Sequence, residues 1–207
     1  MWGWLMVGLS GLIHISTANS ENKNLSKILK PITLLLLMAI LVTTGREEPQ
    51  FIWVAIGLSL AVIADTFSVL PKISTRASFI ALILSFLFYS KGFWSLLQGD
   101  ITWWLPSLLF AGSIILILLL LPKLDTIIFP VSIMGLVLVQ MSWVACAVWM
   151  NNTNMANLYA CLACFVFVAA TLISAVNIYR HPFPNSDLWA TSGFFIAHSL
   201  TVASVIA

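Results

Sequence analysis

The sequence predicts an all-α polytopic transmembrane protein, a bundle of about eight spanning helices joined by short loops. Hydrophobic residues make up 61% of the 207 residues and charged residues only 8%, against about 25% charged residues in an ordinary soluble domain. The apolar residues recur in runs near the roughly 20 residues that cross about 30 Å of hydrocarbon. Because these runs fill the chain, residues 1–207 are predicted to form a single transmembrane domain.

Each predicted span is an apolar run between charged or Pro-, Asn- and Gly-rich breaks. The first span starts at Met1 without the early positive charge of a secretory signal, so we interpret it as a retained helix. Short connections such as residues 46–50 and 122–125 favour antiparallel packing of consecutive helices. The predicted spans are residues 1–18, 31–45, 51–70, 77–97, 103–121, 126–149, 157–179 and 189–207.

The basic residues of the loops predict an orientation, because Lys and Arg are retained on the cytoplasmic side. The even loops hold only Arg46, whereas the odd loops and their borders hold seven of the nine basic residues; Lys91 lies within the fourth span. We therefore expect cytoplasmic odd loops and both termini on the outer side, in what we expect to be the inner (plasma) membrane of a bacterium. The basic residues of the odd loops are Lys23, Lys27, Lys30, Lys72, Arg76, Lys123 and Arg180.

The charge and the cysteine content argue against a nucleic-acid-binding protein and against a metal or redox site. The net charge is only +2 and the basic residues are scattered, so no nucleic-acid partner is predicted. Cys146, Cys161 and Cys164 all fall in apolar segments, where thiols usually pack as small side chains. Cys161 and Cys164 have the spacing of a redox or metal pair, but no further ligands stand at metal spacing, so no metal or other cofactor is expected. No pattern in the sequence indicates an oligomeric state.

Ionisable residues inside the predicted spans are the first candidates for function, because each costs about 2.5–3.5 kcal/mol to insert. Asp65 is predicted about 7 Å inside the cytoplasmic end of the third span, with His14 similarly placed in the first. His198 falls near the middle of the last span, and Lys91 near the outer end of the fourth. Lys30, at the start of the second span, has a stem long enough to reach a carboxylate.

The seventh predicted span adds a polar stripe, because Thr171, Ser174 and Asn177 are three residues apart. Together these groups predict a cavity that opens to the cytoplasm. Purely structural roles are the alternative: a pairing of Asp65 with Lys30 or Lys72, and one interhelical hydrogen bond for each histidine. For Ser174, Asn177 and Gln140 the interhelical hydrogen bond is the favoured interpretation.

Four segments carry a resemblance to a known family. Residues 30–36, which open with Lys-Pro, and residues 64–71, which contain Asp65 and end in Leu-Pro, resemble the YhhN family of membrane proteins, which includes the mammalian lysoplasmalogenases. Residues 85–89 are similar to the Ser-His-x-x-Tyr segment of that family. Residues 194–198 are similar to its final aromatic-rich helix, and the four segments follow the family order.

The resemblance implies an eight-helix hydrolase that cleaves the vinyl ether bond of a lysoplasmalogen, with a lysophospholipid substrate and membrane lipids as its partners. Protonation of the double bond gives an oxocarbenium-like cation that water captures. A carboxyl group can donate that proton and then, as carboxylate, stabilise the cation. The implied catalytic residues are Asp65, His198 and Tyr89, of which the last two orient water or relay protons. The implied substrate-binding residues are Lys30, Ser85, Ser174, Asn177 and His14.

Two positions depart from the family pattern. Phe86 stands where the family segment has His, and Ala175 follows Ser174 where many members have Asp or Asn. These departures leave open another lipid substrate or the loss of activity in a scaffold. A transporter or lipid-binding protein, in which Asp65 carries protons or holds cargo, is the other alternative. Transport is less expected, because no internal repeat is visible.

Overall fold

The computed structural model describes residues 2–18, 23–45, 47–70, 75–99, 103–120, 128–179, 182 and 184–207. These residues form eight α-helices and no strand, which confirms the all-helical class. In chain order they are α1 (Trp2–Ala18), α2 (Lys23–Thr44), α3 (Phe51–Val69), α4 (Thr75–Trp94), α5 (Trp104–Leu120), α6 (Ile128–Asn151), α7 (Met155–Tyr179) and α8 (Ser186–Ile206).

The predicted bounds are close to the observed ones, except at α2. We predicted that the second helix begins at Pro31, but α2 begins at Lys23 and contains Pro31 in its interior. A proline there removes only one backbone donor, the one that would bond the carbonyl of residue 27. The helix therefore continues through it. As a result, Lys30 projects from within α2 rather than from its first turn.

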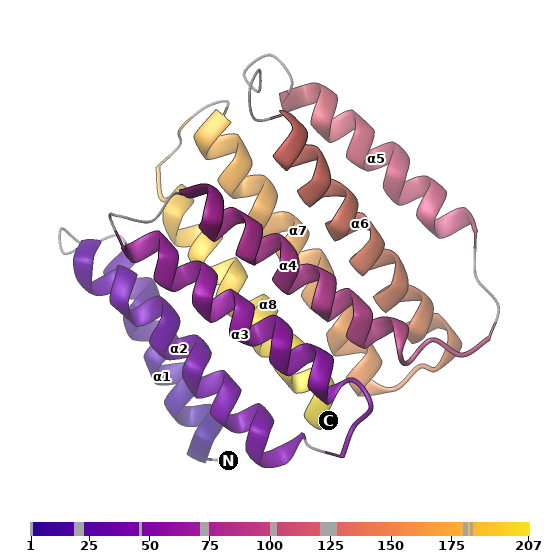
Figure 1. Cartoon of the computed structure of the whole chain (residues 1–207), viewed down its shortest axis with the longest axis horizontal. Coiled ribbons are helices and arrows are strands. Elements are labelled where there is room, and N and C mark those ends of the chain that lie inside the picture. The colour runs from indigo at the N-terminus through magenta and orange to yellow at the C-terminus, as the bar shows by residue number, and fades with distance from the viewer. Residues whose placement is uncertain are drawn as a thin grey trace.

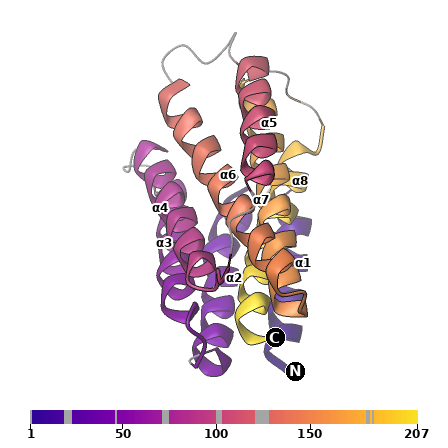
Figure 2. The same cartoon turned by 90° about the vertical axis from the view of Figure 1, so that its right-hand side faces the viewer.

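The helices run side by side along one direction, and both ends of the chain lie at the same end of the bundle (Figure 1, Figure 2). Helix α8 packs against α1, α2, α3 and α7. Helix α5 lies at the margin and packs mainly on α6 (Figure 1). The side chains of α8 that face α2 and α3 are therefore held within the bundle, away from its lipid-facing perimeter.

The outer surface of the bundle is apolar. Leu9 and Leu12 of α1 are 62% and 63% exposed, and Ile115 of α5 is 64% exposed. Five helices in the described part are long and apolar enough to cross a membrane, and three shorter apolar helices accompany them. Such a surface suits lipid and not water. Six tryptophans at or near helix ends are exposed, as residues at a membrane–water interface are: Trp2, Trp4, Trp103, Trp104, Trp149 and Trp189.

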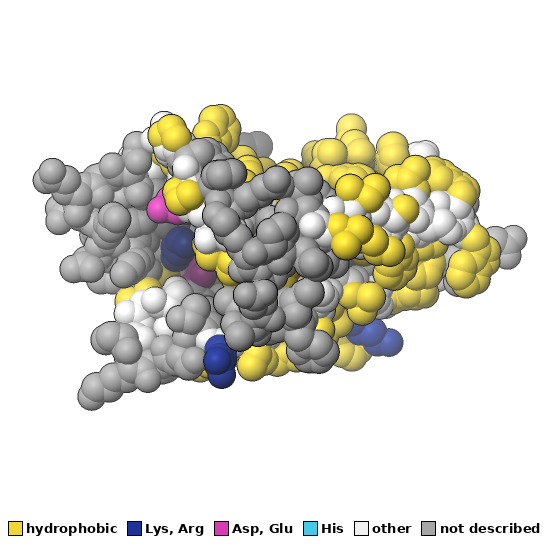
Figure 3. Space-filling model, turned by 90° about the horizontal axis from the view of Figure 1, so that it is seen from above, with side chains coloured by type: hydrophobic (Ala, Val, Ile, Leu, Met, Phe, Trp, Pro, Cys, Tyr) yellow, Lys and Arg dark blue, Asp and Glu magenta, His cyan; other side chains and the backbone are white. Residues whose placement is uncertain are grey.

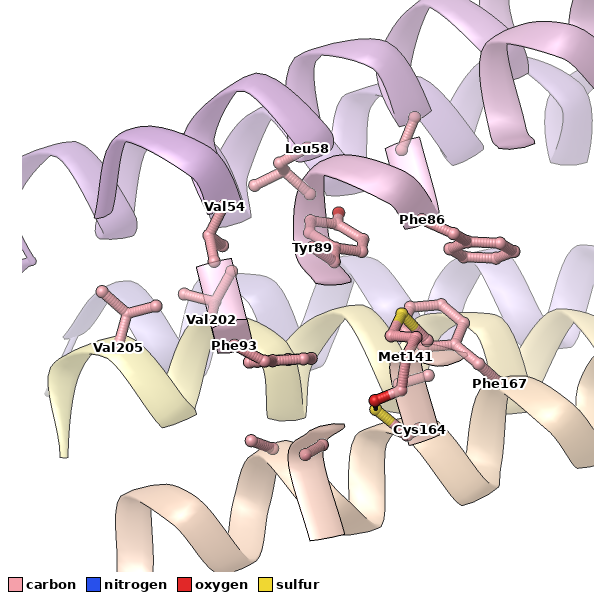
Figure 4. Close-up of a cluster of buried hydrophobic side chains, with 14 of the residues drawn as sticks. Val54, Leu58, Phe86, Tyr89, Phe93, Met141, Cys164, Phe167, Val202 and Val205 are labelled. Atoms are coloured by element: carbon pink, nitrogen blue, oxygen red, sulfur yellow. Dashed lines mark hydrogen bonds between the residues drawn. The ribbon is translucent and has the colours of Figure 1, made fainter. Parts of the chain in front are cut away.

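The core lies between α2, α3, α4, α6, α7 and α8, and Figure 4 shows its part from α3, α4, α6, α7 and α8. Tyr89 and Phe86 of α4 and Phe167 of α7 are fully buried there. Helices α3 and α4 approach closely at Gly57, where a Cβ atom would lie 2.6 Å from the Tyr89 ring. The missing side chain of Gly57 thus leaves the space that the Tyr89 ring fills.

Candidate functional site

A cavity of about 210 Å³ lies between α2, α3, α4 and α8. Its lining combines a carboxylate, an ammonium group, an imidazole and three hydroxyl groups with apolar walls. Most of these residues lie towards the end of the bundle where α3 ends and α8 begins. Seen from above, basic and acidic side chains lie together in a hollow of that face (Figure 3). The lining residues are Lys30, Thr33, Leu34, Ala61, Asp65, Ser68, Leu82, Thr191, Phe194, Phe195 and His198.

Asp65 and Lys30 supply the opposite charges of the cavity. Asp65 lies four residues before Val69, where α3 ends, and its carboxylate interacts electrostatically with the Lys30 ammonium group. Because Lys30 lies within α2, its stem reaches the wall of the cavity directly. The carboxylate is thus placed beside both a cation and an open space, as a group that acts on a bound molecule requires.

His198 presents an imidazole to the cavity from α8. The residue is 4% exposed, and its Nδ1 is hydrogen-bonded to the Tyr89 hydroxyl of α4 at 3.0 Å. The ring of Phe167 packs edge-on against the imidazole with 4.9 Å between ring centroids. Tyr89 and Phe167 therefore hold the orientation of the imidazole from the side away from the cavity.

The aromatic wall of the cavity depends on a glycine of α1. A Cβ atom at Gly11 would overlap the Phe195 ring, which lines the cavity. Beside it, the Ser10 and Thr33 hydroxyls are hydrogen-bonded at 2.8 Å and join α1 to α2. Thr33 also donates to the carbonyl of Leu29 at 2.9 Å. Helix α1 supports the cavity in this way, and none of its described side chains belongs to the lining.

Of the predicted site residues, Asp65, Lys30 and His198 line the cavity together. Tyr89 does not line the cavity but is hydrogen-bonded to His198, which does. Ser85 is fully buried one turn before Tyr89 and does not line the cavity.

The other predicted substrate-binding residues lie elsewhere. Ser174 is partly buried in α7, and Asn177 donates from Nδ2 to Asp187 Oδ1 at 3.3 Å, an interhelical bond between α7 and α8. The side chain of His14 lies outside the described part of the structure, as do those of Lys23 and Lys27 and the whole of Arg46, Lys72, Lys123 and Arg180.

Thr33, Ser68 and Thr191 line the cavity but were not predicted as site residues. Their helical spacing carries the signal: Thr33 and Ser68 each follow a predicted site residue by three positions, and Thr191 precedes His198 by seven. Residues at these spacings share a helix face. Among the described residues, no three His, Cys, Asp or Glu side chains gather as a metal site would need.

Replacing Tyr89 by phenylalanine tests the support of His198. The change keeps the ring over Gly57 but removes the hydroxyl, so a buried imidazole nitrogen loses its partner. We expect the free energy of unfolding to fall by about 1–2 kcal/mol, measured by thermal unfolding in detergent. Tyr159→Phe, on a half-buried tyrosine of α7, is the control and should change the unfolding temperature little. An unchanged temperature for Tyr89→Phe would contradict the importance of this hydrogen bond.

Comparison with known proteins decides the family. The sequence matches the YhhN family over residues 25–205, which is most of the chain. The chain belongs to the YhhN family. It is similar to the "Uncharacterized membrane protein YhhN" of Escherichia coli O6:H1, Escherichia coli O157:H7 and Shigella flexneri, with 24% identity over 206 residues. In each case the match covers 99% of this chain and 99% of the relative. No solved structure matches it.

Membership of this family and the apolar helices together make the chain an integral membrane protein with a helical bundle. The two positions at which this YhhN protein departs from the family pattern both lie outside the cavity lining. Phe86 packs edge-on against Phe167, with 4.8 Å between ring centroids, and Ala175 is half-buried in α7. The cavity lining contains Lys30, Asp65 and His198, three of the residues that the resemblance implies for the site.

Proposed function

We propose that this protein is a membrane-embedded hydrolase that cleaves the vinyl ether bond of lysoplasmalogens. The observation that carries the proposal is the cavity in which the Asp65 carboxylate, the Lys30 ammonium group and the His198 imidazole meet beside apolar walls. A single-chain lipid with a phosphate headgroup matches both parts of this lining. The resemblance of residues 30–36 and 64–71 to the family that includes the mammalian lysoplasmalogenases supports the same chemistry.

In the proposed reaction Asp65, in its protonated form, gives a proton to the vinyl carbon remote from the ether oxygen. The resulting oxocarbenium cation is stabilised by the new carboxylate and captured by water. The hemiacetal then breaks its carbon–oxygen bond, which releases a fatty aldehyde and the hydroxyl of the glycerophospho-headgroup. One water is consumed in total. In the tautomer in which Nδ1 of His198 accepts a hydrogen bond from the Tyr89 hydroxyl, Nε2 carries the ring hydrogen. This N–H group can donate a hydrogen bond to the water and orient it.

The substrate is proposed to lie with its phosphate at Lys30 and its alkenyl chain along the apolar wall. Thr33, Ser68 and Thr191 supply hydroxyl groups near the headgroup, and Phe194 and Phe195 supply the apolar surface. We also propose that all eight helices span the inner membrane of a bacterium, with the odd loops in the cytoplasm and both termini outside. In this topology the substrate enters from the cytoplasmic leaflet.

A lysophospholipid panel tests the proposed function. The purified full chain in detergent is incubated with vinyl ether, alkyl ether and acyl lysophospholipids, and products are measured by mass spectrometry. We expect fatty aldehyde from the vinyl ether lipid alone, since only this lipid has the carbon–carbon double bond whose protonation and hydration give a hemiacetal. Fatty acid from the acyl lipid, or no product from any lipid, would contradict the proposal. In the latter case, uptake of a lipid into vesicles that contain the protein would favour a transporter.

Replacing Lys30 by methionine tests the proposed phosphate contact. Methionine keeps the length and apolar character of the stem but removes the charge that faces Asp65. We expect KM for the vinyl ether lysophospholipid to rise about 10-fold, in line with the loss of one charge-assisted hydrogen bond. Lys91→Met is the control, because Lys91 is exposed and stands over the Trp53 ring, outside the cavity. An unchanged KM for Lys30→Met would remove Lys30 from the headgroup site.

A further inference from the structure

Two thiols from different helices meet away from the cavity. The Sγ atoms of Cys146 in α6 and Cys161 in α7 lie 2.8 Å apart, and the two residues are 5% and 4% exposed. Cys164 faces elsewhere, since its thiol donates to the carbonyl of Met141 at 3.7 Å (Figure 4). The close pair is therefore not the Cys-x-x-Cys pair that the sequence spacing suggests. It joins α6 to α7.

The surroundings of the pair are apolar. Leu105 and Leu109 of α5 and Trp143 of α6 pack around the two thiols. A disulfide bond is about 2.05 Å long, so the sulfurs need to approach by less than 1 Å to bond. Neither cysteine is in a disulfide now. The two helices that carry the pair are already packed against each other.

We propose that Cys146 and Cys161 are a site of reversible oxidation, where an organic hydroperoxide produces a disulfide between α6 and α7. The sulfur of one thiol attacks the outer peroxide oxygen, the O–O bond breaks, and the thiol proton passes to the leaving alkoxide, so that a sulfenic acid and an alcohol form. The second thiol attacks the sulfenic sulfur, the S–S bond forms, and water leaves. The two thiols lose two electrons in total, and the hydroperoxide gains them.

The position of the pair favours this class of oxidant. A neutral, lipid-soluble hydroperoxide can reach thiols that lie among apolar side chains, whereas a charged oxidant would have to shed its hydration. The pair lies near Asn151 and Met155, the ends of α6 and α7. In the topology proposed above these ends face the outer, oxidising side of the membrane, where disulfides persist. The site does not depend on the proposed hydrolase activity.

Counting thiols in the wild-type chain tests the proposal. The purified protein in detergent is treated with cumene hydroperoxide, unfolded, and labelled with a maleimide reagent. We expect two of the three free thiols to become unreactive, and dithiothreitol to restore both. Mass spectrometry of proteolytic fragments should identify a Cys146–Cys161 link within one chain. Three reactive thiols after treatment, or a link between other cysteines or between chains, would overturn the proposal.

Two matched variants separate the pair from the third cysteine. Cys164→Ala should still lose both of its remaining reactive thiols on oxidation, whereas Cys146→Ala should form no disulfide. The oxidised wild type should also unfold at a temperature about 5–10 °C higher than the reduced protein. The reason is that the disulfide restricts the conformational freedom of the unfolded chain. Cys146→Ala should show no such rise, and an equal rise in this variant would overturn the proposal.

Discussion

Replacing Asp65 by asparagine is expected to lower aldehyde release from a lysoplasmalogen by about 10²–10⁴-fold, the usual contribution of a general acid. Asparagine has nearly the same size and still forms hydrogen bonds, so the cavity should keep its shape. Its amide cannot give up a proton as a carboxyl group does, nor can it stabilise the cation with a negative charge. The measurement is the initial rate of aldehyde formation by the purified variant in detergent.

Glu48→Gln is the matched control for this prediction. Glu48 is exposed in the connection before α3 begins, at the opposite end of that helix from Asp65. The same loss of a carboxylate there should leave the rate unchanged. If Asp65→Asn releases aldehyde at the wild-type rate, Asp65 is not the proton donor. Equal loss in both variants would point to a general effect of charge removal on the bundle.

Replacing Gly57 by valine is expected to lower the free energy of unfolding by about 1–3 kcal/mol, as overpacking of a core does. The first added carbon would lie 2.6 Å from the Tyr89 ring and 3.0 Å from the carbonyl oxygen of Ser85. Tyr89 is fully buried and hydrogen-bonded to His198, so the ring cannot move aside without breaking that bond. Thermal unfolding in detergent measures the change, and the aldehyde assay should show a parallel loss.

Gly112→Val is the matched control, because it is the same substitution within a helix. A Cβ atom at Gly112 of α5 meets no other atom within 4 Å. The unfolding temperature of this variant should stay the same or rise slightly, since glycine is unfavourable inside a helix. Equal destabilisation by the two variants would show that the effect does not depend on the close approach of α3 to α4.

The number and order of the helices could be predicted from the sequence because the signal is local. A run of about 20 apolar residues bounded by polar ones is visible without knowledge of its neighbours, and seven of the eight helices begin and end near the predicted residues. The start of α2 could not be predicted in this way. The polar residues before Pro31 look like a loop, and only the structure shows that the helix includes them.

The candidate site was predicted in part. Asp65, Lys30 and His198 could be identified because charged or imidazole groups are rare in apolar segments. Thr33, Ser68 and Thr191 share helix faces with these residues, but the sequence did not show that those faces meet at one cavity. Asn177 contacts Asp187 at the ends of α7 and α8, so its depth alone did not indicate its neighbours.

The sequence by itself determined that this protein is a membrane protein made of apolar helices, with a few ionisable groups buried among them. Only the tertiary structure decided which groups meet: Tyr89 with His198, Cys146 with Cys161, and Asp65 with Lys30 at a cavity. The reason is the solvent. In water a helix marks its packing face by amphipathicity, but in lipid the outer face is as apolar as the inner one. Contacts between membrane helices therefore depend on shape and on small residues such as Gly57, and these are visible only in the folded bundle.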